Sequence, residues 1–354
     1  MNTPTPVRLQ DIADKAGVSR AAVSLALRNH SSIAPATRKR IQELAQELGY
    51  QPNPLVSALM SYQRTTKVQR ARHLTLAIVV NFSHNSGWKN YLSDDLFSTA
   101  TTQAAQHGYQ LEEFWLGDLK MNPQRLSAVL FQRNIPGVIV APLPAAHGLL
   151  NMDWKRFSAV AIGYSLLKPP LHRVTTDRFQ AMRLAMRQLR GMGYSRIGLA
   201  MHLNQDARVN HQWGAAFLWE QQQIPSSERT LPLLLDERDW HEHEFAKWFE
   251  SNRPEVILGY DPSIIDWLKK LGRKVPEDVG FAHLWNPDRS GRFAGLYHDP
   301  PAIGSAAVNF LVGMIHRNER GIPPAPQTLL LDAVWQDGAT VERRQKTERT
   351  PPIT

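Results

Sequence analysis

Three short helical patterns, separated by only a few residues each, occupy the first fifty residues of this 354-residue chain. Residues 9–16 place apolar side chains at the i, i+3, i+4 and i+7 positions of one helix face, and Gly17 follows where a helix end favours positive φ. Ser19 is suited to cap a second helix, and a third pattern begins near Pro35 and ends at Gly49. The first two patterns have helix-turn-helix spacing, and the three helices can share one small core.

The positive charge of the chain is concentrated in the same part. Residues 1–75 contain eleven Lys or Arg and four Asp or Glu, a net charge of +7 out of the +9 carried by the whole chain. Binding to the phosphates of DNA needs such a concentration, whereas an ordinary solvated helix face does not. Charge and helix pattern together therefore predict binding to double-stranded DNA in preference to an unspecialised helical mini-domain.

Motifs at fixed spacings characterise this stretch more closely. They are Asp11–Ser19 (DIADKAGVS), Val23-Ser24, Thr37-Arg38, Gly49-Tyr50, Pro52-Asn53 and Leu59. As a set they resemble the DNA-binding headpiece of the LacI/GalR family of bacterial transcription regulators, whose second helix enters the major groove. The resemblance implies that the DNA-contacting residues are Ser19, Arg20, Ala21, Ala22, Ser24, Arg28, Thr37, Arg38, Tyr50, Asn53 and Leu59. Of these, Arg20 can pair with guanine, and Ala21 and Ala22 offer only methyl contacts.

Several headpiece positions depart from the family pattern. Leu25 stands where the family usually has Arg, and Arg28 where it commonly has Asn, so the operator half-site should differ from the family's commonest ones. Ala34 replaces the usual Ser cap of the third helix, a loss of about 1 kcal/mol that Pro35 partly offsets.

Residues 53–59 combine a helix cap at Asn53 with a proline and a helix too short to persist alone in water. In the family, the corresponding hinge helix folds on operator DNA and inserts a leucine into a minor-groove step, a role that the resemblance assigns to Leu59. The alternative is that Leu59 only packs within a small helix. Val56-Ser57 replaces the family's Ala-Arg, so the resemblance does not extend to the depth of insertion.

The rest of the chain alternates short apolar runs with helical patterns. After a polar, basic linker at 61–73, runs such as 75–80, 137–142 and 256–260 are typical of buried parallel strands, and a last strand is expected at 329–335. The alternation predicts an α/β fold, and the resemblance implies a periplasmic-binding-protein-like core of two doubly wound parallel sheets. The expected parts are an all-α helix-turn-helix domain at 1–52, a hinge and linker at 53–73, a core at 74–342, and a tail at 343–354. Within the core, the N-subdomain is expected at 74–176 and 298–326, and the C-subdomain at 177–297 and 327–342.

Ligands of such a core bind in the cleft where the carboxyl ends of strands from the two subdomains face each other. The candidates by position are Asn81, Trp88, Asp177, His211, Tyr260, Asp261 and Trp285, and the comparison with the family adds Arg208, which is near His211. Asp177 and Asp261 equally suit the caps of the helices that follow them, and packing is the default role of a tryptophan.

Three of these positions differ from the sugar-binding members of the family. His211 stands for Arg, Tyr260 for Asn and Trp285 for Asp. A hexose held in the family's usual way is therefore disfavoured. A carbohydrate-like effector with more apolar surface, such as an oligosaccharide or glycoside stacked on aromatic rings, stays open, and so does the absence of any ligand.

Motifs of other protein classes are weak. The chain has no cysteine, which excludes disulfides, thiol catalysis and cysteine-based zinc sites. The glycines of 191–198 precede a strand instead of following one, unlike a dinucleotide-binding loop, and His241 and His243 do not share a helix face. We therefore expect no catalytic site, no cofactor and no metal. Without a signal-peptide pattern or an apolar run long enough to span a membrane, a cytoplasmic protein is expected.

The expected function is that of a homodimeric, sequence-specific transcription regulator, more often a repressor than an activator, whose cleft effector controls binding to a palindromic operator. Two rivals stay open. One is a small-molecule binding protein that attaches to DNA without sequence preference, which predicts a steep salt dependence. The other is a regulator whose core responds to a partner protein instead of a metabolite.

Overall fold

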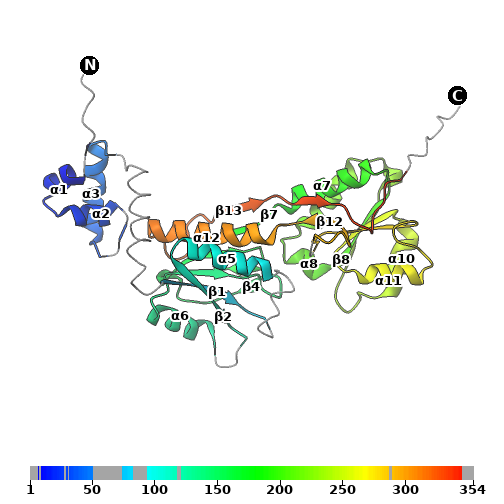
Figure 1. Ribbon diagram of the computed structural model, residues 1–354, viewed down its shortest axis with the longest axis horizontal. Coiled ribbons are helices and arrows are strands. Elements are labelled where there is room, and N and C mark those ends of the chain that lie inside the picture. Colours follow the sequence, from blue (N-terminus) through cyan, green and yellow to red (C-terminus); the bar gives the residue numbers. More distant parts are fainter. Residues whose placement is uncertain are drawn as a thin grey trace, which may run out of the picture.

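The computed structural model describes residues 7, 9–27, 29–30, 32–50, 74–82, 94–117, 121–286 and 289–344. The predicted hinge at 53–59 and linker at 61–73 lie outside the described residues. The expected fold class is confirmed, because a helical headpiece precedes a core with two largely parallel sheets (Figure 1). No helix in the described ranges is long and apolar enough to cross a membrane.

The headpiece consists of the three predicted helices. They are α1 (Leu9–Ala16), α2 (Arg20–Leu27) and α3 (Pro35–Glu47). Gly17 ends α1 with φ +64°, and the Oγ of Ser19 accepts a hydrogen bond from the Ala22 N–H at 3.1 Å, which caps α2. Ile12, Val23 and Ile41, one from each helix, are fully buried against one another, so the predicted shared core is present.

The first sheet has six parallel strands in the order β13-β7-β5-β3-β1-β2. Their bounds are β1 Leu74–Val80, β2 Tyr109–Trp115, β3 Gly137–Val140, β5 Ser158–Ile162, β7 His172–Thr176 and β13 Thr328–Leu331. The helices of this half are α5 (Asp94–Gln106), α6 (Pro123–Gln132), the short η3 (Trp154–Arg156) and α12 (Pro300–Arg317). A separate two-stranded sheet pairs β4 (Gly148–Leu149) with β6 (Leu166–Lys168).

Both faces of the first sheet are buried, as a central parallel strand requires. Alternate residues of β1 face opposite sides, because Ile78 packs with Leu96 of α5, whereas Val79 packs with Leu126 of α6. Helices α5 and α12 pack side by side over the first of these faces (Figure 1). The continuous apolar run that predicted β1 therefore reflects burial on two sides.

The second sheet repeats this plan with the order β14-β12-β11-β10-β8-β9, in which only β14 is antiparallel to its neighbour. Its strands are β8 Ile197–His202, β9 Leu233–Leu235, β10 Val256–Gly259, β11 Gly280–His283, β12 Ala294–Tyr297 and β14 Val334–Gln336. Helices α7 (Arg178–Gly191) and α9 (Gln212–Gln222) cover one face, and α10 (Glu242–Asn252) and α11 (Ser263–Lys270) cover the other. Two short helices, α8 (Leu203–Ala207) and η4 (Ser226–Glu228), complete this half.

The C-terminal strand prediction is wrong. The expected single strand at 329–335 is two strands, because β13 pairs with β7 in the first sheet and β14 pairs with β12 in the second. Only Asp332 and Ala333 separate them. The chain thus passes from the first sheet to the second at Asp332 and Ala333. The C-subdomain segment was expected to start at 327, before β13.

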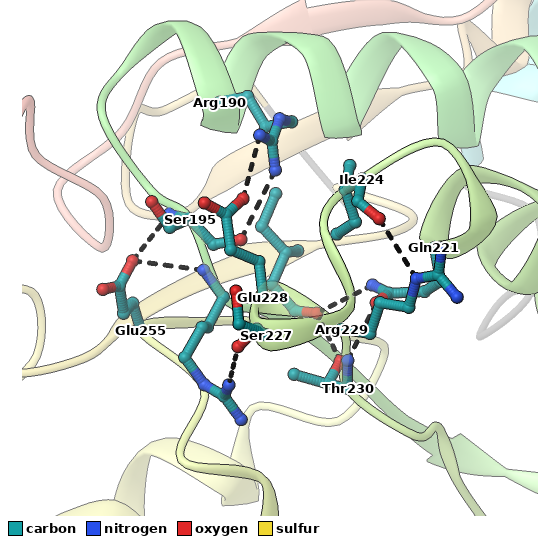
Figure 2. Close-up of polar contacts among 11 residues, drawn as sticks. Arg190, Ser195, Gln221, Ile224, Ser227, Glu228, Arg229, Thr230 and Glu255 are labelled. Atoms are coloured by element: carbon teal, nitrogen blue, oxygen red, sulfur yellow. Dashed lines mark hydrogen bonds and ion pairs between the residues drawn. The ribbon is translucent and has the colours of Figure 1, made fainter.

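A network of polar contacts fixes the amino-terminal edge of the second sheet (Figure 2). The Glu255 carboxylate accepts from the Ser195 N–H at 2.6 Å, and Arg190 pairs with Glu228 at 3.1 Å. The Gln221 side-chain oxygen accepts from the backbone N–H of Thr230 at 2.8 Å. These contacts lie at the edge where β8 and β10 begin, opposite to the edge where ligands of such folds bind.

Candidate ligand cavity and nucleic-acid interface

The start of α2 carries the residues that the sequence predicts to contact DNA bases. Because Ser19 caps the helix, Arg20 and Ala21 stand exposed in its first turn, and Ala22 is half-buried. Ser24 lies one turn further and is also half-buried. The predicted base-contacting residues are therefore together on one exposed helix start.

The remaining predicted DNA contacts lie on α3 and beyond. Thr37 and Arg38 are half-buried, and Nη1 of Arg38 donates to the Asn29 carbonyl at 3.0 Å, which ties α3 to the end of α2. Tyr50 packs on the headpiece core and donates its backbone N–H to the Ala45 carbonyl at 2.9 Å. The predicted contacts at Arg28, Asn53 and Leu59 lie outside the described residues.

A cavity of about 290 Å³ lies at the junction of the two halves of the core. It opens at the carboxyl ends of β5 and β7 in the first sheet and of β10 and β11 in the second, where the topology predicts a ligand site. Its lining residues are Pro142, Ile162, Gly163, Tyr164, Ser165, Thr175, Thr176, Arg178, Gln205, Arg208, Val209, Tyr260, His283, Trp285 and Ile303.

Three of the sequence-predicted effector residues line this cavity: Arg208, Tyr260 and Trp285. The Tyr260 hydroxyl accepts a hydrogen bond from Nε1 of the fully buried Trp213 at 2.9 Å. The Trp285 ring stacks on His298, with centroids 4.4 Å apart and an interplanar angle of 10°. Both aromatic rings are thus held in place by neighbours behind the cavity wall.

Two predicted carboxylates accept hydrogen bonds from backbone N–H groups at helix starts and are not among the residues that line the cavity. The Asp177 side chain accepts from the Gln180 N–H at 2.9 Å and caps α7. Asp261 accepts from the Ser263 N–H at 2.9 Å and from Nε1 of Trp240 at 2.7 Å. Hydrogen bonding, first of all from His202, lowers the pKa of Asp261 well below its usual range. Of the two roles weighed from the sequence, capping has contacts in this structure for Asp177, whereas the N-cap of α11 is Pro262 and Asp261 bonds to the first helical N–H.

Of the other predicted effector residues, His211 and Asn81 are not among those that line the cavity. His211 is exposed in a left-handed conformation with φ 57°, and its Nδ1 lies 3.2 Å from the Asp206 carboxylate. Asn81 is half-buried just after β1. Trp88 lies outside the described residues.

Arg178 is the main cavity residue that the sequence reasoning missed. It is the first residue of α7 and is only 6% exposed. Its Nη1 donates to Thr175 Oγ1 at 2.9 Å and to the Thr176 carbonyl at 3.3 Å. Burial lowers the pKa of Arg178, yet a guanidinium stays charged at physiological pH. A cation in the first turn opposes the helix dipole, and this was the sequence signal available for it.

Two buried histidines beside the cavity are neutral. Burial lowers the pKa of His283, which lines the cavity, to about 4, and its Nδ1 accepts from the Trp285 N–H at 3.0 Å. Burial, reinforced by the positive charge of Arg178, lowers the pKa of His298 to about 3. The positive charge of the cavity wall therefore comes from the two arginines.

The cavity residue Arg208 also joins the two halves of the core. Its Nε and Nη2 donate to the carbonyl of Leu143, at 2.9 and 2.7 Å. Leu143 follows β3 of the first sheet, and Arg208 follows α8, the short helix after β8 of the second sheet. A second contact, from the Ala146 N–H to the Asn204 side chain at 3.3 Å, lies nearby. A molecule that engages Arg208 can therefore alter a contact between the halves.

The headpiece and core together define a class of fold, in which a helix-turn-helix domain precedes a periplasmic-binding-protein-like core with a cavity at its subdomain junction. Within that class, residues 8–53 match the family described as "Bacterial regulatory proteins, lacI family". The resemblance to the LacI/GalR family is thus confirmed. Among the described residues, no group of three or more His, Asp or Glu side chains is arranged to hold a metal ion.

Known proteins resemble the chain beyond the headpiece. The HTH-type transcriptional regulator MalR of Streptococcus pneumoniae is 24% identical over 177 residues, which are 50% of this chain and 51% of MalR. The chain spans about half the length of the curated relatives it matches over more than the headpiece.

Solved structures of similar fold cover nearly the whole chain. One is the lac repressor dimer bound to operator and the anti-inducer ONPF, with 16% identity, a TM-score of 0.53, and coverage of 95% of this chain and 99% of that one. Another is the complex of the transcriptional regulator CelR with cellobiose, with 19% identity, a TM-score of 0.54, and coverage of 94% and 99%. At these identities the likeness establishes the fold.

Proposed function

We propose that this protein is a sequence-specific transcription regulator, acting as a repressor, that binds a palindromic operator as a homodimer. A small-molecule effector in the core cavity controls its affinity for DNA. The observation that carries the proposal is the pairing of an exposed, capped α2 start with a cavity that spans the subdomain junction. The lacI-family headpiece and the repressor fold of solved relatives support it. We place its action in the cytoplasm, where operator DNA is accessible.

On DNA, α2 enters the major groove and its exposed first turn reads base edges. Arg20 pairs with a guanine through two hydrogen bonds, and Ala21 contacts a thymine methyl group. Leu59 in the predicted hinge wedges into the minor groove at the operator centre.

A homodimer follows from the size of the headpiece. Its buried core draws on three short helices only, and one such unit covers too little DNA for specific binding. Two copies related by a two-fold axis match the two half-sites of a palindrome. The lac repressor relative is a dimer on its operator, which supports the same arrangement here.

The effector acts through the junction at which it binds. Arg208 lines the cavity and bonds to Leu143 in the other half, so an occupant of the cavity changes the balance of contacts between the halves. The resulting change in subdomain angle moves the two hinge segments of the dimer and alters their ability to fold on DNA. A coupling of roughly 1–3 kcal/mol is sufficient for control.

The test is selection of bound sequences from a random DNA pool with the purified full chain at near-physiological salt. The expected result is a palindromic site with a defined centre. Arg20→Ala should weaken binding to that site about tenfold or more, because a bidentate base contact contributes roughly 1–3 kcal/mol. Arg187→Ala, an exposed arginine on α7, is the matched control and should bind normally.

Two results would overturn the proposal. No enriched sequence, together with a steep loss of binding as salt rises, would identify a non-specific DNA-attached binding protein. Equal losses of operator and random-DNA binding in Leu59→Ala would contradict the wedge role, since a wedge acts only at the specific site.

A further inference from the structure

We infer that the cavity ligand carries an oxyanion, a carboxylate or a phosphate, held by the guanidinium groups of Arg178 and Arg208. The remainder of the ligand is a single sugar-sized polar body. This inference deepens the proposed function, on which it rests for the regulatory role of the cavity.

The charge of the cavity wall is one-sided. Arg178 and Arg208 contribute two positive charges, and no Asp or Glu is among the described residues that line the cavity. Arg178 forms no ion pair with a carboxylate anywhere in the described ranges, although it is almost fully buried. It also stands at the first residue of α7, where the helix dipole adds positive partial charge. A buried cation in this setting is costly unless a negative group accompanies it.

Three residues of the cavity wall carry a buried polar side-chain atom that has no hydrogen-bond partner. These atoms are Nε of Arg178, Oγ1 of Thr176 and Oε1 of Gln205. All three residues line the cavity. Native proteins rarely leave such atoms unpaired, because each buried unpaired group loses its hydration without compensation. An oxyanion in the cavity is matched to the guanidinium N–H groups of the two arginines, and hydroxyl groups on the same molecule can pair with Thr176 and Gln205 once these side chains turn toward it.

The walls and the size of the cavity define the rest of the ligand. Trp285 has its ring centroid 5.9 Å from the Arg178 guanidinium, and Ile162, Tyr164 and Ile303 add apolar surface. A volume of about 290 Å³ is at the lower end of the roughly 300–1,000 Å³ of small-molecule sites, so one sugar-sized unit fits better than an oligosaccharide. A neutral sugar would leave the buried charge uncompensated, and a cationic ligand would be repelled.

The test is binding of matched ligands to the full chain, measured by calorimetry and by thermal shift at fixed ionic strength. The panel contains neutral hexoses and pentoses, each beside its aldonate, its uronate and its phosphate ester, with acetate and inorganic phosphate alone at millimolar concentration. The expected result is binding of an anionic member at least tenfold tighter than its neutral counterpart. Binding of sugar acids only, or of sugar phosphates only, distinguishes the two sources of the oxyanion.

Variants separate recognition from structure. Arg178→Gln should lower the affinity for the anionic ligand at least tenfold. The melting temperature of the ligand-free protein should be unchanged or higher, because the substitution removes an uncompensated buried charge. Arg183→Gln, on the same helix but in an exposed pair with Glu220, is the matched control and should bind normally. If Arg178→Gln does not fold, Arg178→Lys keeps the charge and should retain the preference for anions at reduced affinity.

Several outcomes would overturn the inference. They are tighter binding of a neutral sugar than of its anionic partners, no binding by any member of the panel, and unchanged anion affinity in folded Arg178→Gln. The proposed function is judged separately, because operator selection is done without ligand and Arg178→Gln should still select the same site. If the protein selects an operator but binds a neutral sugar more tightly, only the inference about the ligand is refuted. If it binds an anionic ligand but selects no operator, only the proposed function is refuted.

Discussion

Mild acid should destabilise the core well above the pH at which most carboxylates titrate, because two histidines are buried without charge. His298 is 1% exposed, and its Nε2 donates to the Leu284 carbonyl at 2.8 Å. Burial, with the positive charge of Arg178, lowers the pKa of His298 from 6.5 to about 3. Burial lowers the pKa of His283 from 6.5 to about 4, against the opposing charge of Asp261.

The direction follows from proton uptake. Below pH 6.5 the unfolded chain protonates both histidines, whereas the folded chain does so only near pH 4 for His283 and pH 3 for His298. The unfolded state therefore binds more protons in this window, and stability falls as the pH falls. Between pH 7 and pH 5, proton linkage lowers the free energy of unfolding by about 2 kcal/mol for each histidine.

The assay is urea unfolding followed by tryptophan fluorescence at pH 7 and pH 5. The free energy of unfolding of the wild-type chain should fall by about 4 kcal/mol from pH 7 to pH 5. In His298→Gln it should fall by about half as much, because one of the two titrating groups is removed. His243→Gln, an exposed histidine at the start of α10, is the control and should behave like the wild type. An unchanged pH dependence in His298→Gln would refute the reasoning, since it would mean that His298 is already protonated in the folded chain or titrates normally.

Two further substitutions test local geometry. Ser19→Ala removes the acceptor of the Ala22 N–H and should destabilise the headpiece by about 1 kcal/mol, measured by amide exchange of α2, whereas Ser19→Asp should restore the protection. Gly295→Ala should abolish soluble expression, because φ is +148° and a Cβ there would lie 2.1 Å from the His283 carbonyl oxygen; Gly191→Ala, with open space around it, should express normally. Normal yield and melting temperature for Gly295→Ala would contradict the close approach of β11 and β12.

The parts of the fold that were predictable are those with local signals. Gly17 and Pro35 mark helix ends by their backbone conformation and Ser19 by its capping hydroxyl, and the structure confirms all three. Strand β12 was missed because its four residues include Gly295 and carry no apolar run. The break at Asp332-Ala333 has no local signal either, since which sheet each flanking strand joins depends on pairing partners far away in the sequence.

The same distinction applies to the cavity. Tyr260 and Trp285 were found because each comes shortly after a strand, and strand ends converge in this fold. Arg208 was found from the family comparison, as a residue near His211. Arg178 was missed because the first residue of a helix is usually solvated. Its burial depends on Trp285 and other residues more than a hundred positions away, which no local pattern reveals.

The late return of the chain to the first sheet has a consequence during synthesis. Residues up to Thr176 supply five of the six strands of the first sheet, but the core of this half also needs Ile303 and Leu311 of α12, and the edge of the sheet needs β13. Roughly 120 residues separate β7 from α12, which at about 5–20 residues per second is on the order of ten seconds of translation. During that interval the nascent first half exposes the surface that α12 later covers. A premature stop before 328 would therefore leave both halves incomplete, so truncated chains should be cleared by proteases instead of accumulating as a folded N-terminal fragment.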